Sequence, residues 1–134
     1  MDSQLSKNLE KNNEIHYYIE RHIPSTPRLW NAVAKPFLNI NRIFPTKQKY
    51  VARMVDEVKK DPNIKKVIVF GSAVLARCNL WSDIDIFFEC EEEPIRLPSI
   101  KDSGQAFDKF TNFGISDEFL DEIIKKGVTV YERE

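Results

Sequence analysis

Long apolar runs, cysteine, glycine and histidine are all scarce in this chain of 134 residues, which has two Cys, four Gly and two His. No apolar stretch approaches the roughly 20 residues that a membrane-spanning helix needs, so we expect no membrane function. The N-terminal stretch MDSQLSKNLEKNNE lacks the apolar core of a signal peptide, and we therefore expect a cytoplasmic protein. In that reducing compartment Cys78 and Cys90 are predicted to be free thiols. Neither cysteine has a CxxC or histidine neighbour, so neither a zinc site nor a thiol nucleophile is expected.

The remaining composition is that of an ordinary soluble domain, with 42% hydrophobic and 31% charged residues. The length fits one domain with a single modest core. The net charge of −1 hides an asymmetry, because residues 1–60 are basic overall and residues 61–134 are acidic. A basic face for an anionic partner is one interpretation. An ordinary solvated surface is the preferred one, because the basic residues are scattered.

Residues 1–46 are predicted to form a helical N-terminal extension. A loose helical period runs through residues 1–22, and a short helix is predicted after Pro24, with Ser25 or Thr26 as its cap. Pro36 would end or kink this helix. Its buried side is predicted to consist of Trp30, Val33 and Phe37.

Residues 47–134 are predicted to form a mixed α/β (α+β) domain, in which helices flank a small mixed sheet. The expected elements are a helix over 47–61, strands over 65–70, 82–89 and 106–111, a short helix over 73–77, a helix over 116–126 and a last strand over 128–132. Ser116 is the predicted cap of the helix over 116–126, and Gly127 its C′ residue. The apolar positions of that helix are Phe119, Leu120, Ile123 and Ile124.

Two carboxylates stand close together in the apolar stretch SDIDIFFE. Side chains two apart on a strand share a face, so Asp83 and Asp85 lie together while Ile84 points into the core. Neighbouring carboxylates repel each other, and partial burial makes the repulsion worse. A raised pKa would relieve it, and a bound divalent cation would relieve it better. The pair therefore favours metal-dependent phosphoryl or nucleotidyl transfer.

The pair Gly71-Ser72 ends the strand before these aspartates. Glycine lets a backbone approach a ligand closely, and the N-terminus of the short helix that is predicted to follow would face a phosphate. The Ser72 hydroxyl would add a hydrogen-bond donor. Gly71-Ser72 alone, or the two aspartates alone, is weak evidence for such a site. The two motifs together are more specific, because each lies at a strand end and a turn and a short helix separate them.

Asp108 is the predicted third acidic ligand, because it lies among apolar residues of AFDKFT in an expected neighbouring strand. The alternative is an exposed residue of an edge strand with no ligand role.

The spacing Gly71-Ser72, ten residues, then Asp83-Ile84-Asp85 resembles the signature of the polymerase-β-like nucleotidyltransferase superfamily. The similarity is greatest to its minimal nucleotidyltransferase branch, which includes antitoxins paired with HEPN-domain toxins. The ending FDKFTNFGISDEFLDEIIKKGVTVYE also resembles that branch. The resemblance covers roughly residues 47–134.

This resemblance implies Mg²⁺ or Mn²⁺ held by Asp83, Asp85 and Asp108, which would form the catalytic site. It implies ATP or another NTP, with its phosphates bound by Gly71, Ser72 and Ser82. An acceptor hydroxyl would attack the α-phosphorus and release pyrophosphate. The acceptor could be a protein, an RNA end or a small molecule. The expected protein partner is a HEPN-type toxin or a second subunit, and the chain could also form a homo-oligomer.

The sequence departs from the family pattern at two positions of the turn. Ala73 stands where the family usually has Arg, and Ala76 where it usually has a second Gly. The connection from Asp85 to Asp108 is also short, with little room for the usual helix. The retained aspartates favour an active enzyme, whereas these changes favour a catalytically weak, antitoxin-like binding module. Mg²⁺-dependent nucleotide binding would separate the two hypotheses.

Overall fold

The computed structural model describes residues 29–76, 78–101 and 103–134. The elements, in chain order, are η1 (Ile40–Arg42), α2 (Pro45–Val58), β1 (Ile64–Phe70), η2 (Gly71–Val74), β2 (Ile84–Cys90), β3 (Phe107–Thr111), α3 (Asp117–Lys126) and β4 (Val128–Glu132). In these ranges, no helix has the length and apolar character needed to cross a bilayer. The helix predicted within residues 1–22 lies outside the described residues.

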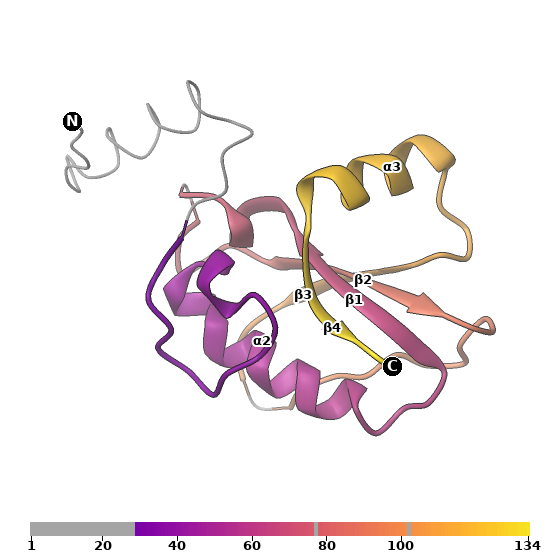
Figure 1. Ribbon diagram of the computed structural model, residues 1–134, viewed down its shortest axis with the longest axis horizontal. Coiled ribbons are helices and arrows are strands. Elements are labelled where there is room, and N and C mark those ends of the chain that lie inside the picture. Colours follow the sequence, from indigo (N-terminus) through magenta and orange to yellow (C-terminus); the bar gives the residue numbers. More distant parts are fainter. Residues whose placement is uncertain (1–28, 77, 102) are drawn as a thin grey trace.

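The four strands form one mixed sheet in the order β3-β2-β1-β4 (Figure 1). β1 pairs antiparallel with β2 and with β4, whereas β2 and β3 are parallel. The predicted mixed sheet is confirmed. The predicted order along the chain of its four strands and of the helices over 47–61 and 116–126 is also confirmed. Because β2 and β3 both run opposite to β1, the end of β1 meets the starts of β2 and β3 at one end of the sheet.

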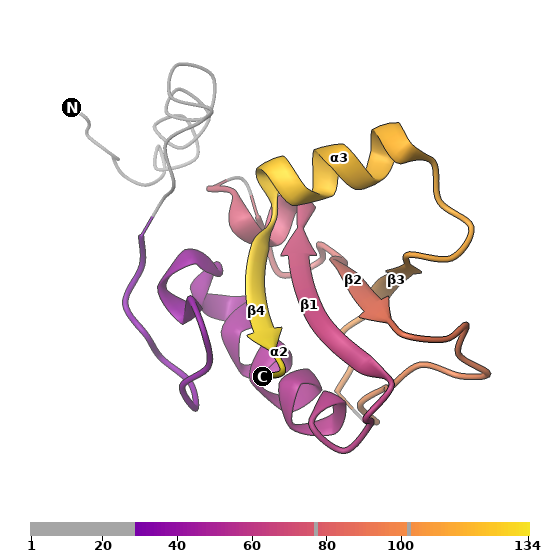
Figure 2. The ribbon, with the colours of Figure 1, turned by 45° about the vertical axis from the view of Figure 1, so that its right-hand side comes forward.

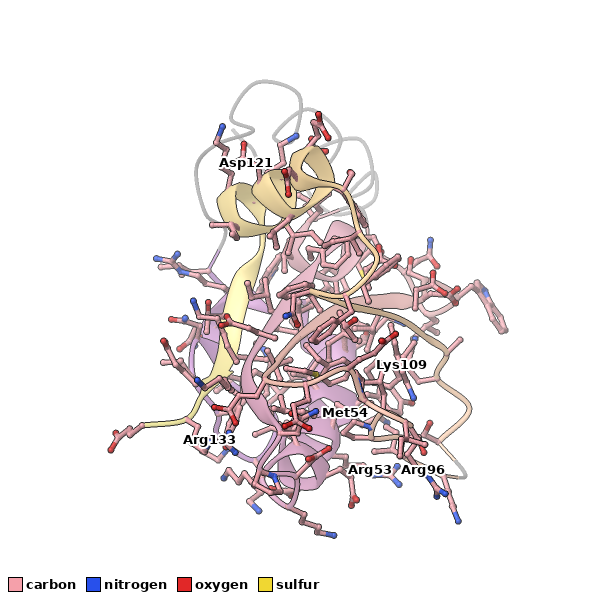
Figure 3. The ribbon with its side chains drawn as sticks, turned by 90° about the vertical axis from the view of Figure 1, so that its right-hand side faces the viewer. Arg53, Met54, Arg96, Lys109, Asp121 and Arg133 are labelled. Atoms are coloured by element: carbon pink, nitrogen blue, oxygen red, sulfur yellow. The ribbon has the colours of Figure 1, made fainter. Side chains whose placement is uncertain are left out.

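Helix α2 covers one face of the sheet and supplies much of the main core. Its apolar positions recur at helical spacing, and Val51, Met54 and Val58 are fully buried. Figure 3 shows Met54 in the interior of the molecule. Alternate strand residues complete this core, which places Ile84 and Ile86 toward α2 and leaves Asp85 on the opposite face.

Helix α3 lies across the end of the sheet where β1 arrives and β4 begins (Figure 2). The Ser116 hydroxyl accepts a hydrogen bond from the Phe119 amide at 3.1 Å, which confirms the predicted cap. The ring of Phe119 packs edge-on against Phe70 and Phe110, with centroids 5.8 and 5.3 Å away. A second, smaller core therefore forms on the face that carries Asp85.

Neighbouring isoleucines of α3 provide a matched test of this small core. Ile123 is 1% exposed, whereas Ile124 is 60% exposed although it is one of the predicted apolar positions. We expect Ile123→Ala to lower the free energy of unfolding by about 3 kcal/mol, because it leaves a cavity. Ile124→Ala should change it by less than about 0.5 kcal/mol. Urea unfolding measures both, and equal losses would contradict the assignment of α3's buried side.

The prediction of a helix after Pro24 is wrong for the part that the structure describes. From Leu29 to Asn39 the chain is irregular, and one turn of 3-10 helix follows, η1. The reason is tertiary: the buried Gln48 side chain accepts from the Val33 amide at 2.7 Å and donates to the Asn31 carbonyl at 2.9 Å. These bonds hold the segment extended along α2, and Val33 is 63% exposed instead of buried.

Trp30 and Phe37 behave as predicted despite the missing helix. The ring of Trp30 packs edge-on against Phe44, with centroids 5.4 Å apart, and Phe37 packs on the main core. Trp30 is therefore a packing residue.

Gly127 corrects a second local prediction. Its φ of −85° is not left-handed, so it is not the C′ residue of a left-handed cap. A Cβ there would instead overlap the side chain of Ile68 and the carbonyl oxygen of Ile123. The position needs glycine because the end of α3 approaches β1 closely.

Candidate active site

Two of the three predicted acidic residues, Asp85 and Asp108, are neighbours where β2 and β3 begin. Asp85 lies opposite Asp108 in the parallel ladder, so the two side chains lie next to each other on one face. Asp83 is exposed and directly precedes β2. The prediction that Asp108 stands in a strand adjacent to Asp85 is confirmed.

The electrostatics of the pair are unfavourable as they stand. Burial, the charge of Asp108, a hydrogen bond with Asp108 and the charge of Asp83 together raise the pKa of Asp85 to about 6. All four effects favour the protonated form. Asp85 is therefore a carboxyl group held in a setting that disfavours its negative charge.

The fit to a divalent cation rests on this donor chemistry. Among the residues that the structure describes, no three Asp, Glu, His or Cys side chains are gathered closely enough to form a metal site. Asp85 and Asp108 form the adjacent pair, and Asp83 acts on Asp85 through its charge. Hard carboxylate oxygens with uncompensated negative charge are what Mg²⁺ and Mn²⁺ prefer. The donor chemistry of Asp85 and Asp108 thus suits such an ion, but Asp83 is not gathered with them into a three-ligand site.

Gly71 covers the carboxylate of Asp85. Phe70 pairs with Asp85 across the β1–β2 ladder, and the chain then turns at Gly71, whose φ is +74°. A Cβ at this position would overlap Asp85 Oδ2. Glycine is needed here both for its backbone conformation and for the approach to Asp85.

Ser72 and Ser82, two of the three predicted phosphate contacts, stand before and after the buried Cys78 in the sequence. Burial raises the pKa of the Cys78 thiol, against the opposing effects of the Lys47 charge and of hydrogen bonds with Ser82 and Ser72. The Ser82 hydroxyl also accepts from the Asn79 amide at 3.1 Å. The thiol donates to the Asn79 carbonyl, with Sγ 3.8 Å from the oxygen.

The short helix predicted over 73–77 is wrong. One turn of 3-10 helix, η2, is followed by extended backbone at Leu75. It is too short to carry the helix dipole that was expected to face a phosphate. The turn is instead fixed by packing: Ala73 is fully buried, and its carbonyl accepts from the Phe44 amide at 2.8 Å.

The two departures from the family pattern therefore lie in the interior. Ala73 is 0% exposed and Ala76 is 4% exposed. An arginine at 73 would have to displace the core that includes Ile43. The small side chain of Ala73 is explained by the segment before α2, which packs on this side of the turn.

Two further residues at the site, Lys47 and Gln105, were not predicted from the sequence. The Lys47 ammonium is buried and donates to the Ser82 carbonyl and to Gln105 Oε1, both at 2.6 Å. A lysine in the first turn of an amphipathic helix is normally solvated, so no pattern could have distinguished this one.

Comparison with known families supports the resemblance that the motifs suggested. The model of the nucleotidyltransferase domain matches residues 51–134, which is more than half of the chain. The chain belongs to the nucleotidyltransferase domain family. Comparison with curated proteins and with solved structures gives no match.

For a nucleotidyltransferase domain the general chemistry is nucleotidyl transfer from an NTP, and such domains typically use a divalent metal ion. The matched range contains the turn at Gly71 and all three aspartates. It begins inside α2, and it leaves out Lys47 and the segment that contacts Ala73.

Proposed function

We propose that this protein transfers a nucleoside monophosphate, AMP from ATP, to a hydroxyl acceptor. The observation that carries the proposal is the pairing of Asp85 with Asp108 beneath Gly71, in a chain of the nucleotidyltransferase family. An uncompensated carboxylate pair next to a close-approach glycine combines ligands for a cation with access for a phosphate.

Each residue has a proposed role. Asp85 and Asp108, joined by Asp83, would hold Mg²⁺ or Mn²⁺, which when bound lowers the pKa of the acceptor hydroxyl and offsets charge on the leaving pyrophosphate. Gly71 would let the triphosphate approach the carboxylates without a side chain in the way. Ser72 would donate its hydroxyl to a phosphate oxygen, and Ser82 would shape the loop that presents Asp83.

The acceptor and the partner are the open part of the proposal. A domain this small has little room for an acceptor pocket, which favours a macromolecular acceptor or a second subunit, such as a HEPN-type toxin or another copy of the chain. Trp81, 90% exposed and two residues before Asp83, stands where an acceptor would approach. Residues 1–46 remain the proposed partner contact, and most of them lie outside the described residues.

Label transfer tests the proposal directly. The full chain is incubated with Mg²⁺, α-labelled ATP and a cell lysate, and the Asp83→Ala/Asp85→Ala double variant is the control. We expect labelled protein, RNA or small molecule with the wild type and at least about 100-fold less with the variant, because the charge-stabilising ligands are gone. CTP, GTP and UTP in place of ATP test the choice of base.

Absence of transfer and of Mg²⁺-dependent ATP binding, in a folded protein, would contradict the proposal. That outcome would instead establish the alternative, a nucleotidyltransferase-fold module that acts by binding a partner.

A further inference from the structure

Lys47 is a fully enclosed lysine near the acidic site. It lies in the first turn of α2 with 1% of its surface exposed. Its ammonium donates to the Ser82 carbonyl and Gln105 Oε1, both at 2.6 Å, and more weakly to the Leu80 carbonyl at 3.4 Å. Burying a lysine is costly unless its donors are satisfied, and here three oxygen atoms satisfy them.

These contacts join the two loops that lead into the acidic strands. Ser82 directly precedes Asp83, and Gln105 lies three residues before Asp108. The side-chain amide of Gln105 also donates through Nε2 to the Ser82 carbonyl at 2.9 Å and to the Ala106 carbonyl at 2.8 Å. Lys47, Ser82 and Gln105 therefore form a closed triangle of hydrogen bonds behind the starts of β2 and β3.

The first rung of the β2–β3 ladder lies directly above this triangle. The Ile84 amide donates to the Ala106 carbonyl at 3.0 Å, one residue before the Asp85–Asp108 pair. Two carboxylates that repel each other tend to push the strands apart at this point. The triangle holds the strands together where that repulsion acts.

We propose that Lys47 is a positioning residue, which fixes the spacing of Asp83 and Asp85 relative to Asp108 through Ser82 and Gln105. The effect of Lys47 on catalysis rests on the proposed function, whereas its effect on the spacing of the strands does not. Lys47 lies outside the residues that match the family model. The site thus depends on a residue of the first turn of α2.

The test compares Lys47→Met with Lys109→Met in the full chain. Lys109 of β3, labelled in Figure 3, is a matched control, because its ammonium is also partly enclosed and donates to a backbone carbonyl, that of Pro98 at 2.8 Å. Three quantities are measured: hydrogen exchange of the Ile84 amide, Mn²⁺ binding by electron paramagnetic resonance, and kcat and KM for ATP. Gln105→Met provides a second variant, in case Lys47→Met does not fold.

We expect Ile84 to exchange at least about 10-fold faster in Lys47→Met than in Lys109→Met, relative to the central amides of β1. Mn²⁺ affinity should fall about 10-fold or more, and kcat about 10- to 100-fold with KM for ATP nearly unchanged, since misplaced ligands weaken charge stabilisation more than substrate binding. Gln105→Met should show the same pattern more weakly.

Each result has a distinct meaning. The positioning role is wrong if the Ile84 amide exchanges at the wild-type rate in a folded Lys47→Met or Gln105→Met variant. It is also wrong if Lys109→Met accelerates that exchange as much as Lys47→Met does. If the wild type neither binds Mn²⁺ nor transfers nucleotide, the proposed function fails, and Ile84 exchange alone still decides whether Lys47 sets the strand spacing.

Discussion

Without divalent cations, Asp85→Asn should be more stable than the wild type at pH 7 and should lose nucleotidyl transfer. Asp85 has a pKa of about 6 in the folded chain, which is well above the ordinary value near 4. The folded state therefore binds this proton more tightly than the unfolded state. At pH 7 the wild type carries an ionised carboxylate in a setting that disfavours it, and asparagine removes that charge.

The pH dependence follows from the same shift. For a raised carboxyl pKa, the stabilising contribution is complete below the unfolded value and is lost as the pH rises through the folded value. The wild type should therefore lose unfolding free energy between about pH 4 and pH 7, and the variant should lack this component. Partial exposure screens the effect, so the gain for Asp85→Asn at pH 7 should be about 1 kcal/mol.

Urea unfolding in EDTA at several pH values measures this gain. The control is Asp83→Asn, because the charge of Asp83 is the smallest of the four causes of the shift and its removal should stabilise much less. Added Mn²⁺ should reverse the order, since it would stabilise the wild type through binding to its carboxylates. A variant that is less stable than the wild type at pH 7 in EDTA would contradict the strained carboxylate pair.

Gly71→Ala should damage both stability and the site. The residue has a φ of +74°, which costs a residue with a side chain about 1–2 kcal/mol. The added methyl group would also overlap Asp85 Oδ2 and displace that carboxylate. We expect a total loss of about 2–3 kcal/mol in unfolding free energy. Transfer should fall by at least about 100-fold, because the displaced carboxylate is a proposed ligand.

Gly104→Ala separates the two causes. Gly104 has the same φ of +74°, but a Cβ there would meet no atom within 4 Å. It should therefore show only the backbone cost, about 1–2 kcal/mol, and should keep nucleotidyl transfer. If both variants lost equal stability and Gly71→Ala still transferred nucleotide, the close approach of Gly71 to Asp85 would have no functional meaning.

Periodicity and capping predicted the regular elements well. The β-branched residues of KKVIVF (65–70) placed β1, alternation in SDIDIFFE placed β2, and Ser116 marked the start of α3. These signals are local, because a strand's two faces and a helix cap depend on residues near in sequence. The same alternation predicted that Ile84 faces the core and that Asp85 lies on the opposite face of β2.

The errors arose where distant contacts decide the conformation. The turn at Ala73 is 3-10 because Phe44, far earlier in the chain, binds its carbonyl. The segment after Leu29 is irregular because the Gln48 side chain binds its backbone. The role of Lys47 depends on Ser82 and Gln105, which are 35 and 58 residues away. No local pattern in one sequence contains such information.

The segment before α2, which is hydrogen-bonded to the Gln48 side chain, also affects where the boundary of the domain is drawn. The family match begins at residue 51, yet the buried Lys47, Gln48 and Ile43 all precede it. A fragment cut at residue 51 would keep all three aspartates of the candidate site and still lose the first turn of α2 and the cover over Ala73. The packed unit that the structure describes thus extends beyond the matched range. Recombinant fragments, chimaeras and domain swaps of this protein should keep the chain from Trp30, whose ring packs on Phe44, and should not begin at the edge of the match.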